Sequence, residues 1–257
     1  MKKNITAILL GLIVPAVIIA LWWYVTEFTA IPQTILPKIS SVAERIGVMW
    51  EKGQIQSDLQ ISLTRVLQGY LVSAVLGVTL GTVMGMSQTA KKMLQPVLTV
   101  VRQIPIIAWI PLLILWFGIG ESSKTVVIVI ASFFPIMINT QAGISGTPLE
   151  YVEVAKLYRL GALRTFFRVY LPHALPHIQT GLKLGLGVSW MAVVAAELIA
   201  STSGIGYSMS YARTLMQSDV VIICMLLIGI VGIIMDKAVS LIFDALTPWE
   251  KKRRERG

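Results

Sequence analysis

One short segment of the chain has the residue types of a phosphate-binding loop. Gly118-Ile-Gly-Glu-Ser-Ser-Lys124 is followed by Thr125. The phosphate-binding motif needs a glycine directly before its lysine, so that backbone N–H groups can surround the phosphates. Ser123 occupies that position here, and the segment runs directly into an apolar stretch. We therefore expect no nucleotide site on this chain.

A second pair of residues has the spacing of zinc ligands. His173 and His177 are four residues apart, as in a helical zinc-protease motif. Ala174 stands where that motif has its glutamate, and Pro172 and Pro176 disfavour a regular helix. The sequence contains no Gly-x-Ser-x-Gly motif that would indicate a serine hydrolase. The chain thus lacks recognisable machinery for making or breaking bonds, and we expect neither a metal nor a cofactor.

Glu197 is a carboxylate inside an otherwise apolar stretch. Charges at membrane depth are costly and often mark proton or ion sites, but a single carboxylate can also be hydrogen-bonded into a helix contact. Both readings remain open from the sequence. Aromatic residues near prolines could line a path or could simply pack. Our candidate path residues are Trp109, Trp116, Trp190 and Glu197.

The composition is that of an integral membrane protein. Hydrophobic residues make up 55% of the 257 residues and charged residues 14%, and the mean hydropathy is +0.76. A soluble globular domain is about one quarter charged, so this chain has too little polar surface to be covered in water. Cys224 is the single cysteine, which excludes a disulfide scaffold. A soluble enzyme is excluded as well.

Six apolar segments are long enough to cross a bilayer as helices, which takes about 20 residues. They are residues 5–25, 66–86, 97–119, 125–144, 178–200 and 220–243. None alternates as barrel strands do, so we predict an all-α membrane protein with six transmembrane helices. The first segment follows Lys2 and Lys3 as a signal peptide would. Its length, and the poor cleavage site around Trp22, favour an uncleaved anchor.

The distribution of basic residues predicts the orientation. With the N-terminus inside, the outer segments hold equal numbers of basic and acidic residues, and 13 of the 22 basic residues lie inside. This is the asymmetry of the positive-inside rule, and it predicts cytoplasmic termini. We also expect Arg102, Lys183 and Lys237 at inner helix ends, and Arg65 in the outer connection, residues 26–65. Nucleic-acid binding is disfavoured because the charge is spread over short loops. The inner basic residues are Lys2, Lys3, Lys91, Lys92, Lys156, Arg159, Arg164, Arg168, Lys251, Lys252, Arg253, Arg254 and Arg256.

The long inner connection, residues 145–177, carries the most information. Val154, Leu157 and Tyr158 fall at i, i+3 and i+4, so one helical face is apolar. A second apolar group, residues 166–170, follows a glycine. We predict two short helices that project from the membrane and dock on a partner, or a helix that lies flat on lipid headgroups. In the outer connection, residues 42–50 form an amphipathic stretch that we expect along the interface.

Glycines recur every four residues in two of the expected spans. Gly77, Gly81 and Gly85 lie on one face of the second span, and Gly181 and Gly185 lie on one face of the fifth. Small residues at this spacing allow two membrane helices to approach closely. We expect these glycines to serve helix packing.

The inner connection resembles the EAA loop of ABC importer permeases, whose pattern is E-A-A-x3-G-x9-I-x-L-P. Glu153-Val-Ala155 and Leu171-Pro172 fit this spacing without a gap, and Val169 takes the isoleucine position. The family glycine falls on Arg159, and the nearest glycine is Gly161. Because a left-handed helix cap is costly for arginine, we expect the turn to shift to Gly161.

Other segments are similar to the taurine/alkanesulfonate branch of the same family, which also contains nitrate/bicarbonate and thiamine-pyrimidine-precursor permeases. These segments are residues 62–69, 102–111, 115–124, 194–200, 203–207 and 246–249. The resemblance implies a type I importer permease fold. It divides the chain into an N-terminal anchor and outer loop (1–60), a five-helix core (61–245) and a basic cytoplasmic tail (246–257).

The resemblance also implies the function and the partners. The chain would be a multi-pass permease of the bacterial inner membrane that forms the path for a small organic anion, most plausibly a sulfonate or taurine. It would pair with a second permease subunit, a cytoplasmic ABC ATPase dimer and an extracytoplasmic binding protein. ATP hydrolysis would belong to the ATPase. The residues implied in coupling are Glu153, Ala155, Arg159, Gly161, Leu171 and Pro172.

Two other functions compete with this one. An ATP-independent carrier or channel would use Glu197 as a gate or proton site, and inverted repeats with broken helices would favour it. We find no convincing internal symmetry of that kind. An intramembrane enzyme is disfavoured by the absence of catalytic pairs.

Overall fold

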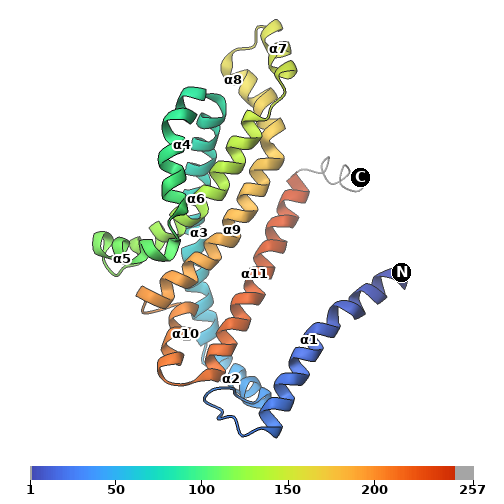
Figure 1. The fold of residues 1–257 in the computed structure, drawn as a ribbon, viewed down its shortest axis with the longest axis vertical. Coiled ribbons are helices and arrows are strands. Elements are labelled where there is room, and N and C mark those ends of the chain that lie inside the picture. The colour runs from blue at the N-terminus through green and yellow to red at the C-terminus, as the bar shows by residue number, and fades with distance from the viewer. Residues whose placement is uncertain (1, 247–257) are drawn as a thin grey trace.

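A computed structural model describes residues 2–246, and every regular element in that part of the chain is a helix (Figure 1). The all-α prediction is confirmed. The expected basic tail lies outside the described residues except for Leu246. The elements are α1 Lys2–Phe28, α2 Ile39–Glu51, α3 Gln54–Met86, α4 Gln88–Gln103, α5 Ile106–Phe117, α6 Glu121–Ser145, α7 Leu149–Leu157, α8 Ala162–Thr165, the π-helix η1 Phe166–Tyr170, α9 Leu171–Ala200, α10 Ile205–Thr214 and α11 Ser218–Leu246.

Within residues 2–246, five helices are long and apolar enough to cross a membrane, and a sixth span exists if α4 and α5 are counted together. The prediction of one continuous helix over residues 97–119 is wrong, because α4 and α5 meet at 98°. Pro105 has no N–H to donate and disfavours a helical conformation at the residue before it. Ile104 is accordingly extended, with φ −75° and ψ 120°.

The break in this span also changes the place of Arg102. The prediction that Arg102 lies at an inner helix end is wrong, because α4 begins fourteen residues earlier at Gln88 and Arg102 is in its last turn. The prediction that Arg65 lies in an outer connection is wrong too. The helix α3 begins at Gln54 and contains Arg65 as a buried residue.

Glycines hold α6 between α3 and α9. A β-carbon on Gly81 would lie 2.5 Å from the carbonyl oxygen of Met137, and one on Gly185 would lie 2.7 Å from the Ile136 side chain. Gly77 and Gly85 make equally close contacts with α6, and so does Gly181. The packing role expected for these five glycines is confirmed, and their partner helix is α6.

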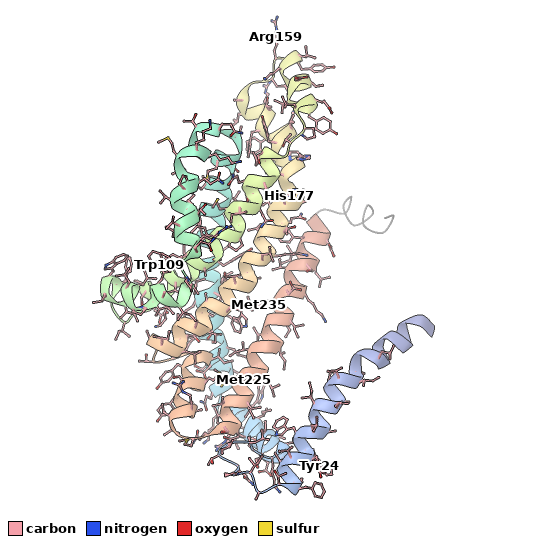
Figure 2. All side chains as sticks on the ribbon, in the orientation of Figure 1. Tyr24, Trp109, Arg159, His177, Met225 and Met235 are labelled. Atoms are coloured by element: carbon pink, nitrogen blue, oxygen red, sulfur yellow. The ribbon has the colours of Figure 1, made fainter. Side chains whose placement is uncertain are left out.

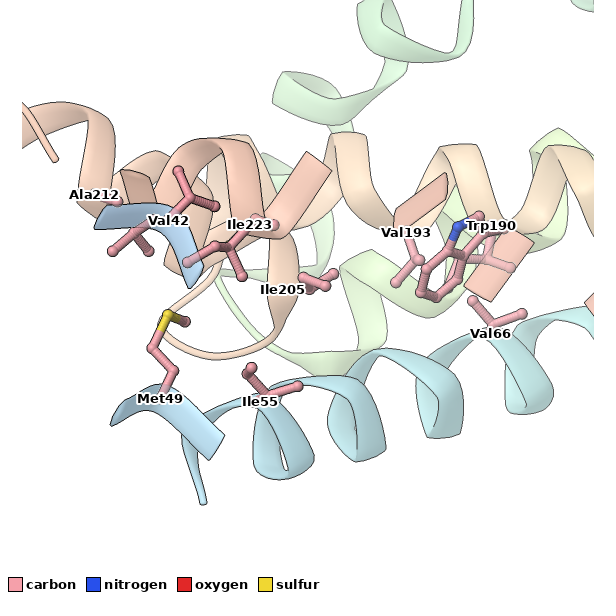
Figure 3. Close-up of a cluster of buried hydrophobic side chains, with 12 residues drawn as sticks. Val42, Met49, Ile55, Val66, Trp190, Val193, Ile205, Ala212 and Ile223 are labelled. Carbon is pink, nitrogen blue, oxygen red and sulfur yellow. The ribbon is translucent and has the colours of Figure 1, made fainter. Parts of the chain in front are cut away.

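A cluster of buried apolar side chains lies at the end of the molecule that carries α2 and α10 (Figure 3). We call this end of the molecule the α10 end. Val66 of α3, Trp190 of α9 and Ile223 of α11 are buried in the cluster. The amphipathic stretch expected at residues 42–50 forms most of α2, and its Val42 and Met49 are buried in this cluster. These contacts position α2 on the helix bundle.

The other end of the molecule carries α7 and α8, and we call it the α7 end. In Figure 1 these two short helices extend past the ends of α4 and α11, and α1 diverges from the bundle. From Leu10 onward most side chains of α1 are exposed, as expected for a helix surrounded by lipid. The Trp22 indole of α1 donates to the Pro37 carbonyl oxygen at 3.0 Å.

Candidate functional site

The connection between α6 and α9 forms an apolar projection at the α7 end. It consists of α7, α8 and η1, and we call it the α7–α8 projection. Leu157 is 82% exposed, Tyr158 is 78% exposed and Val154 is 50% exposed. Large apolar side chains that extend beyond a membrane bundle are typical of a surface that binds another protein.

The helix α7 ends in a Schellman motif. The Leu160 N–H donates to the Ala155 carbonyl oxygen at 3.0 Å, and the Arg159 N–H donates to the Lys156 carbonyl oxygen at 2.9 Å. This pair of bonds requires a left-handed residue at the position of Arg159. Arg159 has φ +50°, and its side chain extends from the tip of the projection (Figure 2).

The prediction that the turn shifts to Gly161 is therefore wrong. Gly161 has φ −66° and ψ 159°, an extended conformation open to any residue. The left-handed position stays at Arg159, where the permease pattern has its glycine, because the two carbonyl groups at the end of α7 fix where the cap forms. A β-carbon on Gly161 would meet no atom within 4 Å.

The other residues implied in coupling lie along the same connection. Ala155 is the one residue of α7 that is buried, at 2% exposure, and Glu153 is exposed. Leu171 is half-buried at the start of α9, and Pro172 follows it. Pro172 lies inside a helical run that continues from Ala162 to Ala200, so its missing N–H interrupts the helical hydrogen bonds directly after the π-helix η1. The structure thus places all six residues in the projection or at its junction with α9.

A buried ion pair joins three helices toward the α10 end. Arg65 of α3 donates through Nη1 to Glu197 Oε1 of α9 at 2.7 Å, and the two side chains are 4% and 0% exposed. The Ser62 hydroxyl lies 2.8 and 2.9 Å from the two oxygens of Glu197. The Gly206 N–H donates to Glu197 Oε2 at 2.9 Å, which brings in α10. Each oxygen of this buried carboxylate therefore has a polar partner, as burial requires.

Glu121 at the start of α6 binds the other edge of the Arg65 guanidinium. Nε and Nη2 of Arg65 lie 2.7 and 2.6 Å from the two oxygens of Glu121, a bidentate pair. The buried Lys124 ammonium donates to Glu121 Oε1 at 3.0 Å. Two cations thus face two carboxylates. Lys124 is the lysine of the segment that is similar to a phosphate-binding loop, and its charge is thus paired with Glu121.

The segment between α9 and α10 lies close to this network. Arg65 also donates to the Ser203 carbonyl oxygen at 2.8 Å. Gly204 has φ +101°, and a β-carbon there would lie 2.4 Å from Glu197 Oε1. Only glycine combines this backbone conformation with so close an approach to a side chain. The structure therefore shows Glu197 hydrogen-bonded into a helix contact.

Sequence reasoning missed Arg65 as the partner of Glu197. The signal was available, because a carboxylate at membrane depth needs a cation or several donors. Arg65 and Ser62 are one turn apart, so both side chains reach the same face of α3. The apolar run of the second span begins at residue 66, so hydropathy alone assigns Arg65 to the preceding connection.

The four candidate path residues do not come together. Trp190 is 4% exposed, and its indole donates to the Ile228 carbonyl oxygen of α11 at 2.9 Å. Glu197 is 1% exposed. Trp109 is half-buried in α5 (Figure 2), and Trp116, on the same helix, is 62% exposed. Trp116 is thus the member of the four that is most open to a substrate.

Comparison with known proteins identifies the family. Residues 73–252 match the family described as "Binding-protein-dependent transport system inner membrane component". A Bacillus subtilis (strain 168) protein that carries the name aliphatic sulfonates transport permease is 36% identical over 239 residues, covering 93% of this chain and 87% of that protein. The taurine transport system permease protein of Escherichia coli (strain K12) is 35% identical over 243 residues, covering 91% and 87%. The nitrate import permease protein of Leptolyngbya laminosa is 34% identical over 206 residues, covering 80% and 71%.

A solved structure shows the same fold. The crystal structure of an amino acid ABC transporter with histidines superposes with a TM-score of 0.64 at 16% identity, covering 77% of this chain and 96% of that chain. The predicted type I importer permease fold is confirmed. The chain belongs to the family of binding-protein-dependent transport inner membrane components, and it is a membrane-embedded permease subunit of an ABC importer rather than an enzyme.

Proposed function

We propose that this permease forms the membrane path for a small organic anion, an aliphatic sulfonate or taurine, and is driven by a separate ATPase that binds the α7–α8 projection. The observation that carries the coupling is the exposure of Leu157 and Tyr158 at the tip of this helical connection. A relative named as a nitrate permease makes nitrate the second candidate substrate.

The basic residues support a cytoplasmic α7 end. Lys156, Arg159, Arg164 and Arg168 lie in the projection, and Lys91 and Lys92 lie near the start of α4. Basic residues in short connections favour the cytoplasmic side. This orientation places the projection where an ATPase can reach it and leaves the α10 end facing the binding protein. With this topology both termini are cytoplasmic.

The helix α5 supports pairing with a second copy of the permease. Leu115 is 80% exposed and Trp116 is 62% exposed on this short helix, which turns away from the bundle. A homodimer would place the path between the two copies. In that arrangement Trp109 and Trp116 remain our path candidates, whereas Trp190 and Glu197 support the helices behind them.

Site-directed crosslinking tests the projection as the ATPase contact. In a Cys224→Ser background, Leu157→Cys is compared with Ile35→Cys, which is 69% exposed in the connection between α1 and α2. We expect Leu157→Cys to crosslink to the ATPase and to react with an impermeant thiol reagent only after the cells are opened. Ile35→Cys should react in intact cells and should not reach the ATPase. Crosslinks from Leu157→Cys to phospholipid alone would overturn the proposed coupling.

Reconstitution with the ATPase and the binding protein tests the substrate. Taurine, ethanesulfonate and nitrate are added separately, and ATP hydrolysis is measured. We expect a sulfonate to stimulate hydrolysis, and Leu157→Asp to abolish that stimulation while the protein remains in the membrane. Stimulation by nitrate alone would assign the second candidate.

A further inference from the structure

A polar cavity of about 300 Å³ opens between α4 and α6. Neither the buried ion pair nor the α7–α8 projection contributes to it. Six of its twelve lining residues are polar or charged: Lys91, Gln95, Thr99 and Arg102 of α4 and Gln141 and Ser145 of α6.

The spacing of these residues shows that α4 and α6 each contribute a polar stripe to the cavity, whose other lining residues are apolar: Met84, Leu98, Phe134, Met137, Ile138 and Ala142. Positions 91, 95, 99 and 102 recur at intervals of four, four and three, which places them on one face of α4. Gln141 and Ser145 are one turn apart on α6. The opposite face of α4 exposes Met93, Val97 and Val100. The helix thus has an apolar face, suited to lipid or to another subunit, and a polar face turned to the cavity.

The charge of the cavity is positive. Lys91 and Arg102 both line it, and no carboxylate of residues 2–246 does. Among the described side chains no carboxylate forms an ion pair with either cation. Arg65 and Lys124, by contrast, are paired with carboxylates.

Arg102 lies far along α4 from the first residue of that helix, and it is exposed on the surface of this subunit. It follows Gln88, the first residue of α4, by fourteen residues. At 1.5 Å per residue this places it about 21 Å along the axis from that end. An arginine in a segment that crosses a bilayer needs water or an anion beside it.

A second cavity, of about 420 Å³, adjoins Arg102 at the break between α4 and α5. Arg102, Phe134 and Ile138 line both cavities. Apart from Arg102, the second cavity is lined by apolar side chains and proline, including Ile106, Ile130 and Val188. Arg102 therefore lies where the first cavity, with its polar and cationic residues, meets the apolar second cavity.

We propose that this pair of cavities is a binding site for an oxyanion with an aliphatic tail, with Arg102 holding the oxyanion and the α4–α5 break holding the tail, while Lys91, about 16 Å away along α4, makes the far side of the first cavity positive. This inference rests on the proposed function, because the bound anion would be the transported substrate on its way through the membrane. The planar guanidinium of Arg102 can donate two parallel bonds to a sulfonate group, whereas Lys91 adds a point charge.

The phosphate of an anionic lipid has the same oxyanion chemistry, so the test uses two lipid compositions. The permease–ATPase complex is placed in nanodiscs of phosphatidylcholine or of phosphatidylglycerol, without ATP or binding protein. Binding of radiolabelled butanesulfonate is measured in both, with methanesulfonate and 1-butanol as competitors. Retained phosphatidylglycerol is measured by mass spectrometry.

We expect butanesulfonate to bind in phosphatidylcholine discs and methanesulfonate to compete less well, because it lacks the tail. Arg102→Gln should weaken binding about tenfold or more, as expected for a lost charge-assisted pair. Arg102→Lys should retain part of the affinity, and Lys91→Gln should weaken binding by a smaller factor. Lys92→Gln is the matched control, since Lys92 is exposed beside Lys91 and does not line the cavity. It should bind as the wild type does.

Three results would overturn the site: no butanesulfonate binding by the wild type, unchanged binding by Arg102→Gln, or an effect of Arg102→Gln confined to phosphatidylglycerol retention. Thermal unfolding of each variant separates lost affinity from lost fold, and rescue by Arg102→Lys requires a folded site. Failure of the proposed function is distinguishable, because an absent crosslink from Leu157→Cys to the ATPase leaves this binding result unchanged.

Discussion

Arg65 and Glu197 are separated by 132 residues in the chain, and their charged groups lie 2.7 Å apart in the folded protein. The pair is almost fully buried. Removing one partner of a buried pair leaves an uncompensated charge, and this costs more than the pair itself contributes. Loss of either charge alone is therefore expected to weaken the contact of α3 with α9.

Glu197→Gln should destabilise the permease by on the order of 3 kcal/mol, because Arg65 would keep Glu121 and lose its buried anion. The midpoint of thermal unfolding in detergent should fall by several degrees. Lys38→Gln is the control, since it removes an exposed ion pair with Glu27, and exposed pairs contribute little. A Glu197→Gln protein as stable as the wild type, with altered transport, would instead favour a gate.

Gly204→Ala should prevent accumulation of folded protein. Its β-carbon would lie 2.4 Å from Glu197 Oε1, and alanine disfavours φ +101°. Gly47→Ala is the matched control, because a β-carbon on this α2 residue meets no atom within 4 Å. Size-exclusion profiles of the two variants check the prediction, which a monodisperse Gly204→Ala peak at wild-type yield would contradict.

Arg159→Gly should stabilise the α7–α8 projection by about 1 kcal/mol, since glycine adopts the left-handed conformation without the steric cost that arginine bears. Hydrogen exchange of the Leu160 amide, which is bonded to Ala155, should become slower. Gly161→Ala serves as the comparison and should leave this exchange rate unchanged. Faster exchange in Arg159→Gly would show that the arginine side chain holds the cap.

Trp190→Phe should lower the free energy of unfolding by about 1 kcal/mol, because it removes the indole bond to the Ile228 carbonyl oxygen. Trp23→Phe changes an exposed residue of α1 and should have no measurable effect. Chemical unfolding in detergent checks both. Equal stability of the two variants would mean that the bond between α9 and α11 contributes nothing.

Hydropathy predicted most of the membrane spans because a bilayer requires long apolar helices whatever their neighbours. The same reasoning failed at residues 97–119, where Pro105 acts locally and a window average does not register it. Arg65 was missed for a related reason. A charged residue ends an apolar segment in a sequence scan, but a partner from a distant helix allows it to be buried.

The EAA-like spacing predicted where the α7–α8 projection lies in the chain. The residue that forms its turn was predicted wrongly. Preference for glycine at a left-handed position pointed to Gly161, whereas the carbonyl groups of Ala155 and Lys156 fix the cap at Arg159. The cavity beside Arg102 could not be predicted, because its two walls come from helices whose relative rotation the sequence does not encode locally.

The close glycine contacts of α3, α6 and α9 have a mechanical consequence. The ion pairs of Arg65 with Glu121 and Glu197 join the same three helices toward the α10 end. We therefore expect α3, α6 and α9 to move together as one unit. The helix α9 runs for 30 residues, a lever arm of about 45 Å. A tilt of about 5° imposed near Pro172 would displace its opposite tip by about 4 Å over that length.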